Sequence, residues 1–464
     1  MVHQKIKNII LLVMVLVCVY LSSHVWLQLP DFLTYNLQRN ETEQGEEEKP
    51  EIDMWNVVRP LKNIIKYKEN YTVFYSDYEY DLWKKTVNIL AEGLKNSKSN
   101  ELNNPSPIAF PTNYLKFDFA SGIPIEIFTK HLDISNKEIN EKIKTVKNII
   151  VDLDKKNCIY IFNGSDSFKF ENEKINTDDL VKLIGNIDFN RYTKYAENLK
   201  IGNENIKTAV PMEQIALNPV FVQSELDVFD TEKINNIAKD YFKNNYEYVR
   251  KVVELSGNRA YTYRTEKVLK IKAEGQLDFY DSNIDKKHSH DVYDSLNIAL
   301  VFTENFLGFP KDGYLGSIES IQNEGNYGYR FTFSYKLHDR PILFSKVREN
   351  AALQIDVIGD RVVSYKRFIR NIDEKQNDKM QNIQVLPALE VLNLNMQTEG
   401  DVNAGAELKP FKTDMIKDIS NIYLGYFDLS RISKEQLLRV VWVFEVGDKS
   451  YIFNAITGAL IEKW

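Results

Sequence analysis

The chain has 464 residues, of which 43% are hydrophobic and 12% aromatic, and its 59 Lys+Arg against 66 Asp+Glu give a net charge of −7. This length suggests about two to four domains, with enough apolar material for real cores. The scarcity of Gly (19) and Pro (13) excludes collagen-like and wholly disordered chains, and the two cysteines exclude a disulfide scaffold. Neither composition nor charge supports a nucleic-acid-binding surface.

The first strong signal is an apolar run near the N-terminus. Ile9 to Leu21 is unbroken, and the apolar stretch continues to Leu27 after three more polar residues. As a helix it spans roughly 28 Å, which is close to one bilayer core. Lys5 and Lys7 precede it, so the positive-inside rule places the N-terminus in the cytoplasm and the rest of the chain outside. We therefore predict a transmembrane anchor within residues 1–29 and a cell-membrane, single-pass protein.

Three residues of this segment are candidate contact sites. Trp26 lies where an interfacial aromatic would anchor the outer end of the helix. Cys18 and Ser22 are four residues apart and share a helix face, with the small side chains that allow a partner helix to approach closely. That these two residues simply face lipid is an alternative that stays open. Another is a cleaved signal peptide, although no A-x-A cleavage site follows the run.

Residues 30–54 are predicted to form an acidic linker. The stretch from Glu41 to Asp53 contains seven acids and one base, which is typical of a solvated, self-repelling spacer. Residues 54–464 carry only −3, so the net acidity belongs mostly to the linker.

The pattern becomes globular at Trp55, and we predict an α+β N-terminal ectodomain over residues 55–205. Its first helix is expected at 78–94, and extended segments are expected at 71–75, 114–119 and 124–129. The strands 149–153 and 158–162 flank Asp154-Lys155-Lys156-Asn157, which is a hairpin signal. Periodicity then breaks over 195–207.

A central α+β domain is predicted at 206–285. Thr231 is the expected cap of a helix whose Ile234, Ile237, Ala238 and Phe242 face inward. Four short strands follow at turn spacing, at 248–255, 259–264, 268–273 and 277–280.

The last domain, predicted at 286–464, repeats this order. A helix at 290–306 precedes strands, and a second helix at 386–394 precedes more. The strands are expected at 314–324, 327–337, 353–358, 361–368, 422–429, 438–446 and 451–453. Helix followed by antiparallel strands thus occurs three times after residue 206, as a repeat of pattern rather than of sequence.

The search for catalytic motifs returns little. The chain has no G-x-S-x-G motif, since Gly316-Ser317-Ile318 lies in a predicted strand, and it has no phosphate-binding loop, no H-E-x-x-H and no cysteine pair at metal spacing. His288 and His290 lie among carboxylates and could hold a divalent metal. The competing interpretation is a polar inter-domain loop with Ser289 as a helix cap. Cys158, between apolar neighbours, fits a buried strand residue better than a nucleophile.

A set of segments along nearly the whole chain resembles the YycH (WalH) family, exported regulators of an essential sensor histidine kinase in Gram-positive bacteria. These segments are Trp26–Asp31, Val57–Leu61, Trp83, Ala238–Phe242, Val249–Arg250, Tyr261–Arg264, Tyr329–Phe331, Arg340–Phe344, Val362–Arg367, Trp442–Phe444 and Tyr451–Gly458. The last two are similar to the final domain of the companion regulator YycI and to PepSY-like modules. The segment 261–265 lacks the Asp-Gly turn that is frequent in the family, which points to a divergent clostridial-type branch.

This resemblance implies a membrane-tethered, non-enzymatic protein without a cofactor or a resident metal. Its implied partners are a sensor kinase of the WalK/YycG type and a YycI-like protein, contacted through transmembrane helices and ectodomain, with an effect on cell-wall metabolism. A PepSY-like module that binds a protease or a cell-wall ligand is the alternative, and a cell-wall hydrolase is a third hypothesis.

Overall fold

A computed structural model describes residues 53–76, 79–97, 111–282, 290–323, 325–346, 351–397, 410–429 and 435–464. These belong to one compact unit, Ile52–Trp464. The predicted anchor and nearly all of the acidic linker lie outside the described residues. Within the described ranges, no helix has the length and hydropathy needed to cross a bilayer.

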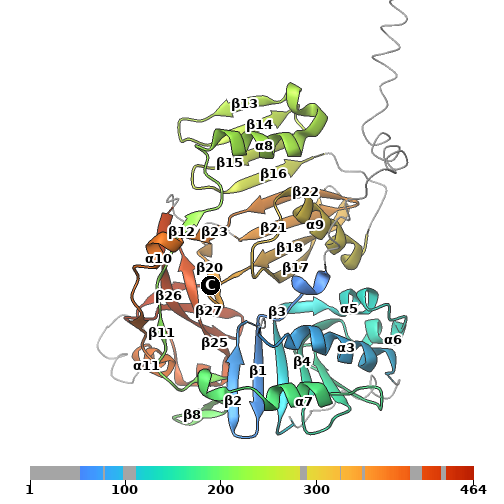
Figure 1. The fold of residues 1–464 in the computed structure, drawn as a ribbon, viewed down its shortest axis with the longest axis vertical. Helices are drawn as coiled ribbons and strands as arrows, with labels where there is room; N and C mark the ends of the chain where they lie inside the picture. Colours follow the sequence, from blue (N-terminus) through green and yellow to red (C-terminus); the bar gives the residue numbers. More distant parts are fainter. Residues whose placement is uncertain are drawn as a thin grey trace, which may run out of the picture. The chain divides into compact units, whose positions relative to one another are not determined.

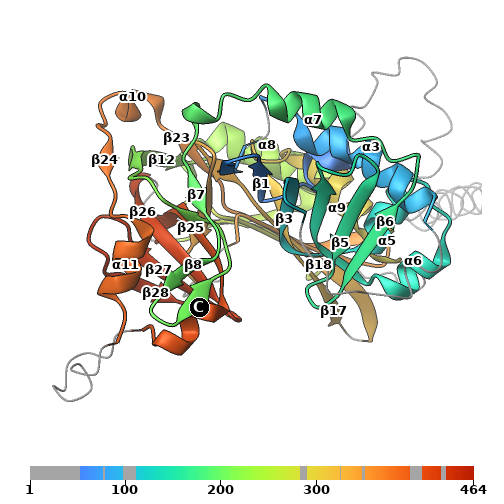
Figure 2. The same cartoon turned by 90° about the horizontal axis from the view of Figure 1, so that it is seen from below.

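Sheet A is antiparallel, and its strands follow the order β2-β1-β3-β4-β5-β6 (Figure 1). These strands are β1 (Lys62–Tyr67), β2 (Asn70–Phe74), β3 (Tyr114–Pro124), β4 (Thr145–Asp152), β5 (Cys158–Phe162) and β6 (Ser167–Glu171). Its helices are α3 (Leu82–Lys95), α5 (Ile125–His131), α6 (Lys137–Lys142) and α7 (Asp178–Gly185). α3 and α7 lie along one face of the sheet (Figure 2). The predicted hairpin of β4 and β5 is confirmed, with Ile150 paired to Tyr160.

Sheet B runs β13-β14-β15-β16-β22-β21-β18-β17, and α8 (Thr231–Phe242) and α9 (Val292–Phe306) accompany it. The first four strands are β13 (Arg250–Val253), β14 (Arg259–Tyr263), β15 (Lys267–Ile271) and β16 (Leu277–Asp281). The others are β17 (Tyr314–Asn323), β18 (Asn326–Ser334), β21 (Leu353–Ile358) and β22 (Arg361–Arg367). The apolar face predicted for the helix of the central domain, α8, is confirmed, because Ile234, Ile237, Ala238 and Phe242 are all buried.

Sheet C follows the order β19-β20-β25-β26-β12-β23, and β27 and β28 extend it from β26. Its strands are β12 (Val220–Ser224), β19 (Lys336–Leu337), β20 (Arg340–Phe344), β23 (Arg370–Ile372), β25 (Ile419–Asp428), β26 (Glu435–Val446), β27 (Lys449–Asn454) and β28 (Leu460–Lys463). β20 runs parallel to β25, and α11 (Ala388–Leu394) packs on the sheet through Val391 and Leu392. Short strands and one short helix complete the described fold: β7 (Tyr195–Ala196), β8 (Leu199–Ile201), β9 (Glu204–Ile206), β10 (Val210–Pro211), β11 (Ala216–Leu217), β24 (Ile383–Gln384) and α10 (Glu374–Asn377).

The predicted α+β class, with helices and antiparallel strands, is confirmed for the described chain. The helix-then-strands repeats do not form separate sheets, however. Strands β13–β16 and β17–β22 lie on either side of the predicted boundary at 285/286, yet β16 pairs with β22 in one sheet. Similarly, β12 from the predicted central domain pairs with β26 in sheet C. The predicted domain ranges themselves stay a prediction.

Three local predictions are wrong, each for an identifiable reason. Of the residues 124–129, Pro124 ends β3 and the other five begin α5 rather than a strand. A short apolar run fits both periods, and here Ile125, Phe128 and Thr129 are buried together on one helix face. Asp230, not Thr231, caps α8, since its side chain accepts a hydrogen bond from the Lys233 N–H. Asp291, not Ser289, caps α9, and its carboxylate accepts from two backbone N–H groups.

The faces of sheets A and C pack against each other. Along β4 and β5, Ile149 and Ile159 face the helices, whereas Ile150 and Tyr160 face the opposite way. This alternation is expected of a strand buried on both faces. The second face of sheet A meets an apolar surface of sheet C. The sheet C residues in this contact are Leu343, Tyr423, Phe427, Val441, Val443 and Ile452.

Cys158 lies in this inter-sheet layer and is fully buried, which confirms its prediction as a buried strand residue. Burial raises the pKa of its thiol to about 11. Because the thiolate is the reactive form, we expect iodoacetamide at pH 8 to leave Cys158 unmodified in the folded protein and to modify it in urea. Mass spectrometry of a Cys18→Ser variant would measure this. Rapid native labelling would contradict the burial of the thiol in this layer.

Candidate functional site

The residues that the sequence singled out for partner and membrane contact lie outside the described part of the chain. This applies to Cys18, Ser22 and Trp26, and also to His288. Their roles therefore stay predictions. His290 is described and lies just before α9. Among the described residues, no group of His, Cys, Asp and Glu side chains is arranged to hold a metal ion.

The most telling feature of the described chain is its first segment, residues 53–61, which we call the junction segment. Asp53 caps a single 3-10 turn, η1 (Met54–Asn56), by accepting a hydrogen bond from the Trp55 N–H at 3.1 Å. Met54, Val57 and Val58 are almost completely buried. The chain that arrives from the predicted acidic linker therefore enters the interior of the folded unit at once, instead of running along its surface.

On one side the junction segment packs against the layer formed by sheet A and its helices. The Trp55 ring lies 5.8 Å from Trp83 and 5.6 Å from Phe128, centroid to centroid. It also meets His131 edge-on at 5.0 Å. The Leu61 N–H donates to the carbonyl of Asp118 on β3 at 2.8 Å. These contacts hold the segment against α3, α5 and β3.

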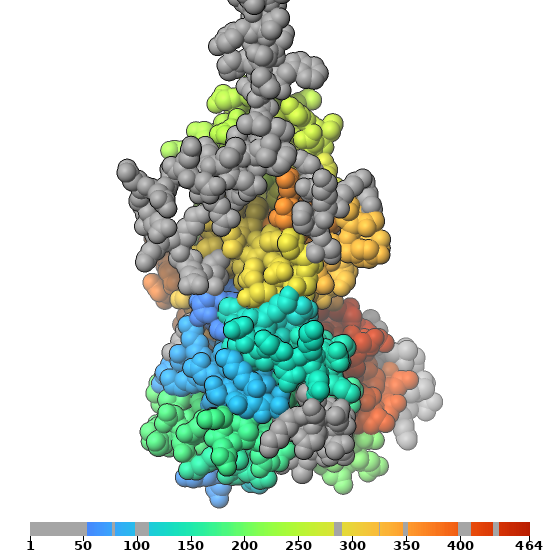
Figure 3. Space-filling model, turned by 90° about the vertical axis from the view of Figure 1, so that its right-hand side faces the viewer, coloured from blue at the N-terminus to red at the C-terminus, as the bar shows by residue number. Residues whose placement is uncertain are grey.

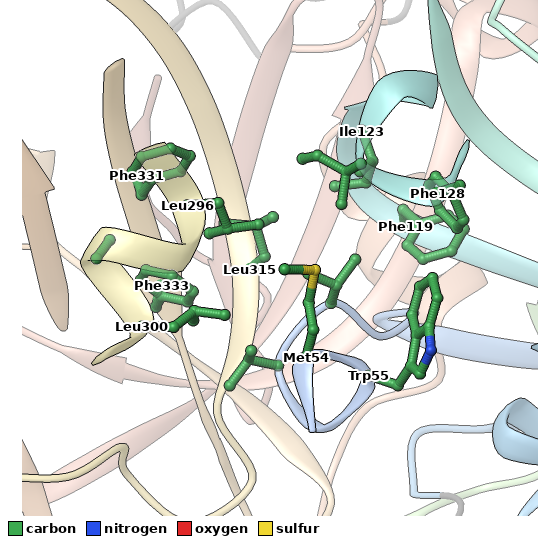
Figure 4. Close-up of a cluster of buried hydrophobic side chains, with 14 of the residues drawn as sticks. Met54, Trp55, Phe119, Ile123, Phe128, Leu296, Leu300, Leu315, Phe331 and Phe333 are labelled. Atoms are coloured by element: carbon green, nitrogen blue, oxygen red, sulfur yellow. The ribbon is translucent and has the colours of Figure 1, made fainter. Parts of the chain in front are cut away.

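On its other side the same segment contacts sheet B. The Leu315 N–H on β17 donates to the Val57 carbonyl at 2.8 Å. Figure 4 shows Met54 pointing between Leu315 and the α9 residues Leu296 and Leu300, while Trp55 points toward Phe128 and away from α9. One short segment thus joins the layer of sheet A to a strand of sheet B that follows the segment by about 250 residues in the sequence.

A second contact joins these layers at the surface. Figure 3 shows the cyan surface that includes α5 against the yellow surface that includes α9. Lys130 on α5 forms an ion pair with Asp291, the cap of α9, and His131 Nδ1 lies 3.3 Å from the Tyr293 hydroxyl. The pKa of Asp291 is lowered: burial opposes this, but hydrogen bonds from Lys130 and from backbone N–H groups favour the carboxylate. The layers of sheets A and B are therefore joined at two places, by the buried junction segment and by this contact between α5 and the start of α9.

Beside the junction segment lies a cavity of about 170 Å³. Its apolar wall includes Trp55, Phe74 and Trp83, and its polar lining includes Asn63 and Asp312. Asn63 is almost completely buried and its Oδ1 atom has no hydrogen-bond partner among the described residues. A cavity of this size has room for several water molecules, and a water bound there would satisfy the Asn63 Oδ1 atom.

The charged groups around this cavity connect all three sheets. Arg59 lies 3.6 Å from Asp312, whose pKa is raised by burial and held back by the Arg59 guanidinium. Lys62 is buried on β1 and donates to Asn421 Oδ1 on β25; burial lowers the pKa of its ammonium, and Asp118 opposes this. Lys336 on β19 donates to the Tyr75 carbonyl. Buried lysines thus connect sheets A and C where their apolar faces meet.

Sequence reasoning found the junction segment only in part. The pattern was predicted to become globular at Trp55, and Val57–Leu61 is one of the segments that resemble the YycH family. Its partners Asp312 and Leu315 follow about 250 residues later, and no local pattern links them to it. The cavity and the lysine contacts were missed for the same reason.

Comparison with known proteins gives one informative match. The model of the YycH protein N-terminal domain matches residues 4–188, which include the predicted anchor, the linker and all of sheet A. No curated protein matches the chain.

Two solved structures show weak similarity. An uncharacterized protein from Eubacterium rectale ATCC 33656 is 12% identical, with a TM-score of 0.35, over 58% of this chain and 93% of that one. The C-terminal domain of Bacillus megaterium YpeB is 12% identical, with a TM-score of 0.27, over 50% of this chain and 96% of that one. At these scores the likeness supports no argument about fold or function. The comparisons therefore support one statement: residues 4–188 of this chain match the N-terminal domain of YycH proteins.

Proposed function

We propose that this protein is a membrane-anchored extracytoplasmic regulator that modulates a sensor histidine kinase of the WalK/YycG type together with a YycI-like partner, and so tunes cell-wall metabolism. The observation that carries the proposal is the YycH N-terminal domain match, because it begins at residue 4 and includes the predicted anchor as well as sheet A. Proteins of this family are regulators, and a regulator with an anchor acts within the membrane plane.

The junction segment supports this proposal mechanically. A regulator that is joined to its membrane helix by a solvated spacer needs a folded unit that holds the end of this spacer in one place. Here the residues that follow the linker are buried between two layers, with Val57 bonded to β17 and Leu61 bonded to β3. A displacement of the folded unit is then passed to the linker through several buried contacts rather than through a loose tail.

The physical requirement on the anchor is simple. A single helix shifts the two-state equilibrium of a kinase only if it binds one state more tightly than the other. Cys18 and Ser22 present small side chains on one helix face, which allows close packing against a kinase helix. Differences in packing of about 1.4 kcal/mol change the state ratio tenfold.

The test compares the full chain with two variants in the native host. Residues 1–40 alone should still co-purify with a sensor kinase and retain part of the regulatory output. The double variant Cys18→Leu/Ser22→Leu should reduce the co-purified kinase about tenfold, because larger side chains on the contact face prevent close approach. A Val13→Leu/Val17→Leu variant, which lengthens side chains at two other positions of the anchor, is the matched control.

Two results would contradict the proposal. If residues 1–40 lose all output while the full chain without its kinase partner still binds a protease or a cell-wall ligand, the protein is an extracytoplasmic binding module. If the Cys18/Ser22 variant co-purifies with the kinase as well as the unmodified chain does, the contact lies on another face of the helix.

A further inference from the structure

Sheet B ends in an unusual strand. β13 is the last strand of the sheet at one end, with β14 as its neighbour in the described chain (Figure 1). All four of its residues, Arg250–Val253, are exposed. Val253 is 69% exposed, Tyr248 78%, and Leu255 fully. An edge strand that leaves this much apolar surface in water is a site for pairing with another strand.

The backbone of β13 determines which residues could pair. Glu254 N–H donates to the Asn258 carbonyl at 2.9 Å, and Val252 and Arg250 lie opposite Ala260 and Thr262. In an antiparallel ladder the hydrogen-bonded residues alternate along the strand. The backbone groups of Arg250, Val252 and Glu254 therefore point toward β14, and those of Lys251, Val253 and Leu255 point away from the sheet.

This alternation limits how β13 can pair with a second β13. Antiparallel pairing centred on Val252 places Lys251 opposite Val253 of the second copy, so outward-pointing groups meet outward-pointing groups. The same register places Val249 opposite Leu255. Pairing centred on Lys251 would bring two lysines together, and pairing centred on Val253 would leave Arg250 opposite Ser256.

The charges of the strand fit the register centred on Val252. There, Arg250 lies opposite Glu254 of the second copy, and the two-fold symmetry repeats this contact. Both side chains lie on the face of sheet B that is opposite α8, because they alternate with Lys251, whose ammonium contacts Tyr246 on the α8 side. Glu254 already binds Lys270 at 2.9 Å, and a carboxylate has acceptor sites for a second cation.

Charged residues on an edge strand can also serve to keep other strands away. That role would suit a strand whose charges have one sign. β13 itself carries two cations, Arg250 and Lys251, but Glu254 follows it directly. The segment 250–254 therefore has a base and an acid four residues apart, so it is complementary to itself when it is reversed, with the apolar Val252 at its centre.

We propose that two copies of this protein associate through β13, with the strands antiparallel and centred on Val252, so that sheet B continues from one copy into the other. The symmetry of this contact places α8 of both copies on the same face of the joined sheet.

Cysteine cross-linking of the full chain in membranes tests the register directly. Opposed residues in a non-hydrogen-bonded pair have Cα atoms roughly 4.5 Å apart, which suits a disulfide. In a Cys18→Ser background, Val252→Cys should give a covalent homodimer with copper phenanthroline and dissolved oxygen. Val301→Cys, at a 55% exposed valine on α9, is the control and should stay monomeric. The proposal would be overturned if Val252→Cys and Val301→Cys gave equal yields of covalent homodimer, or if Val252→Cys cross-linked to a different protein instead.

A charge-swap experiment tests the same contact without cysteines. Arg250→Glu and Glu254→Lys should each lower co-purification of two differently tagged copies about tenfold, because each places like charges opposite one another twice. Mixing the two variants should restore association, since each altered residue then meets its opposite charge. If the mixture associates no better than the single variants do, β13 is not the contact.

Discussion

Replacing Arg370 by methionine should lower the free energy of unfolding by about 3–5 kcal/mol, the cost of leaving a buried charge without its ion-pair partner. Arg370 on β23 and Asp428 on β25 are both inaccessible to solvent, and their Nε and Oδ2 atoms lie 3.0 Å apart. In this variant Asp428 still accepts a hydrogen bond from the side-chain amide of Gln436, but it no longer forms an ion pair with Arg370. Urea unfolding of residues 53–464 would measure the loss.

The position of Arg370 explains why its loss should affect all of sheet C. Its guanidinium also donates to Ser224 Oγ on β12 at 2.7 Å and stacks on the Phe368 ring. The Tyr335 hydroxyl, just before β19, accepts from the backbone N–H of Arg370, a bond that Arg370→Met leaves in place. One side chain therefore holds together strands that no local sequence pattern connects.

The control for this prediction is another arginine in an exposed pair. Arg361 lies 3.7 Å from Asp360, and both side chains are more than one third exposed, so Arg361→Met should cost less than about 1 kcal/mol. The double variant Arg370→Met/Asp428→Leu should recover part of the loss, because an apolar pair needs no charge compensation. A double variant that is less stable than both single variants would contradict the assignment.

Local signals in the sequence predicted elements better than they predicted pairings. The apolar face of α8 and the β4–β5 hairpin are correct, since periodicity and turn residues are properties of neighbouring residues. The strand predicted at 124–129 failed because a run of six residues is too short to separate the two periods. The pairing of β16 with β22 could not be predicted, because their residues Phe279 and Tyr365 are brought together only by the tertiary fold.

The same division applies to the candidate site. The sequence pattern predicted a folded unit from Trp55 onward, and the structure buries Trp55, Val57 and Val58. That this segment would lie between two layers depends on Leu315 and on α9, which are specified by a different part of the chain. A short segment has no signal for its long-range partners, so the junction emerged only from the fold.

Replacing Trp55 by alanine should cost about 3–5 kcal/mol in the free energy of unfolding, the usual loss when a buried tryptophan is truncated. Trp55 is 9% exposed and its ring contacts Trp83, Phe128 and His131. The cavity beside it would enlarge, because Trp55 is part of its wall. Urea unfolding followed by tryptophan fluorescence and by circular dichroism would measure the change.

The structural role of Trp55 also predicts how its loss couples to other residues. The losses in the free energy of unfolding caused by Trp55→Ala and by Phe128→Ala should be non-additive by about 0.5–3 kcal/mol, because the two rings share a contact. The control is Phe229→Ala, at a 74% exposed ring, which should change stability by less than about 0.5 kcal/mol. In the host, Trp55→Ala should weaken regulatory output at expression levels matched to the unmodified chain, since the junction would no longer hold the linker firmly. Additive losses for Trp55 and Phe128, or full output from a destabilised Trp55→Ala variant, would show that the junction segment is an ordinary part of the core and does not transmit position to the anchor.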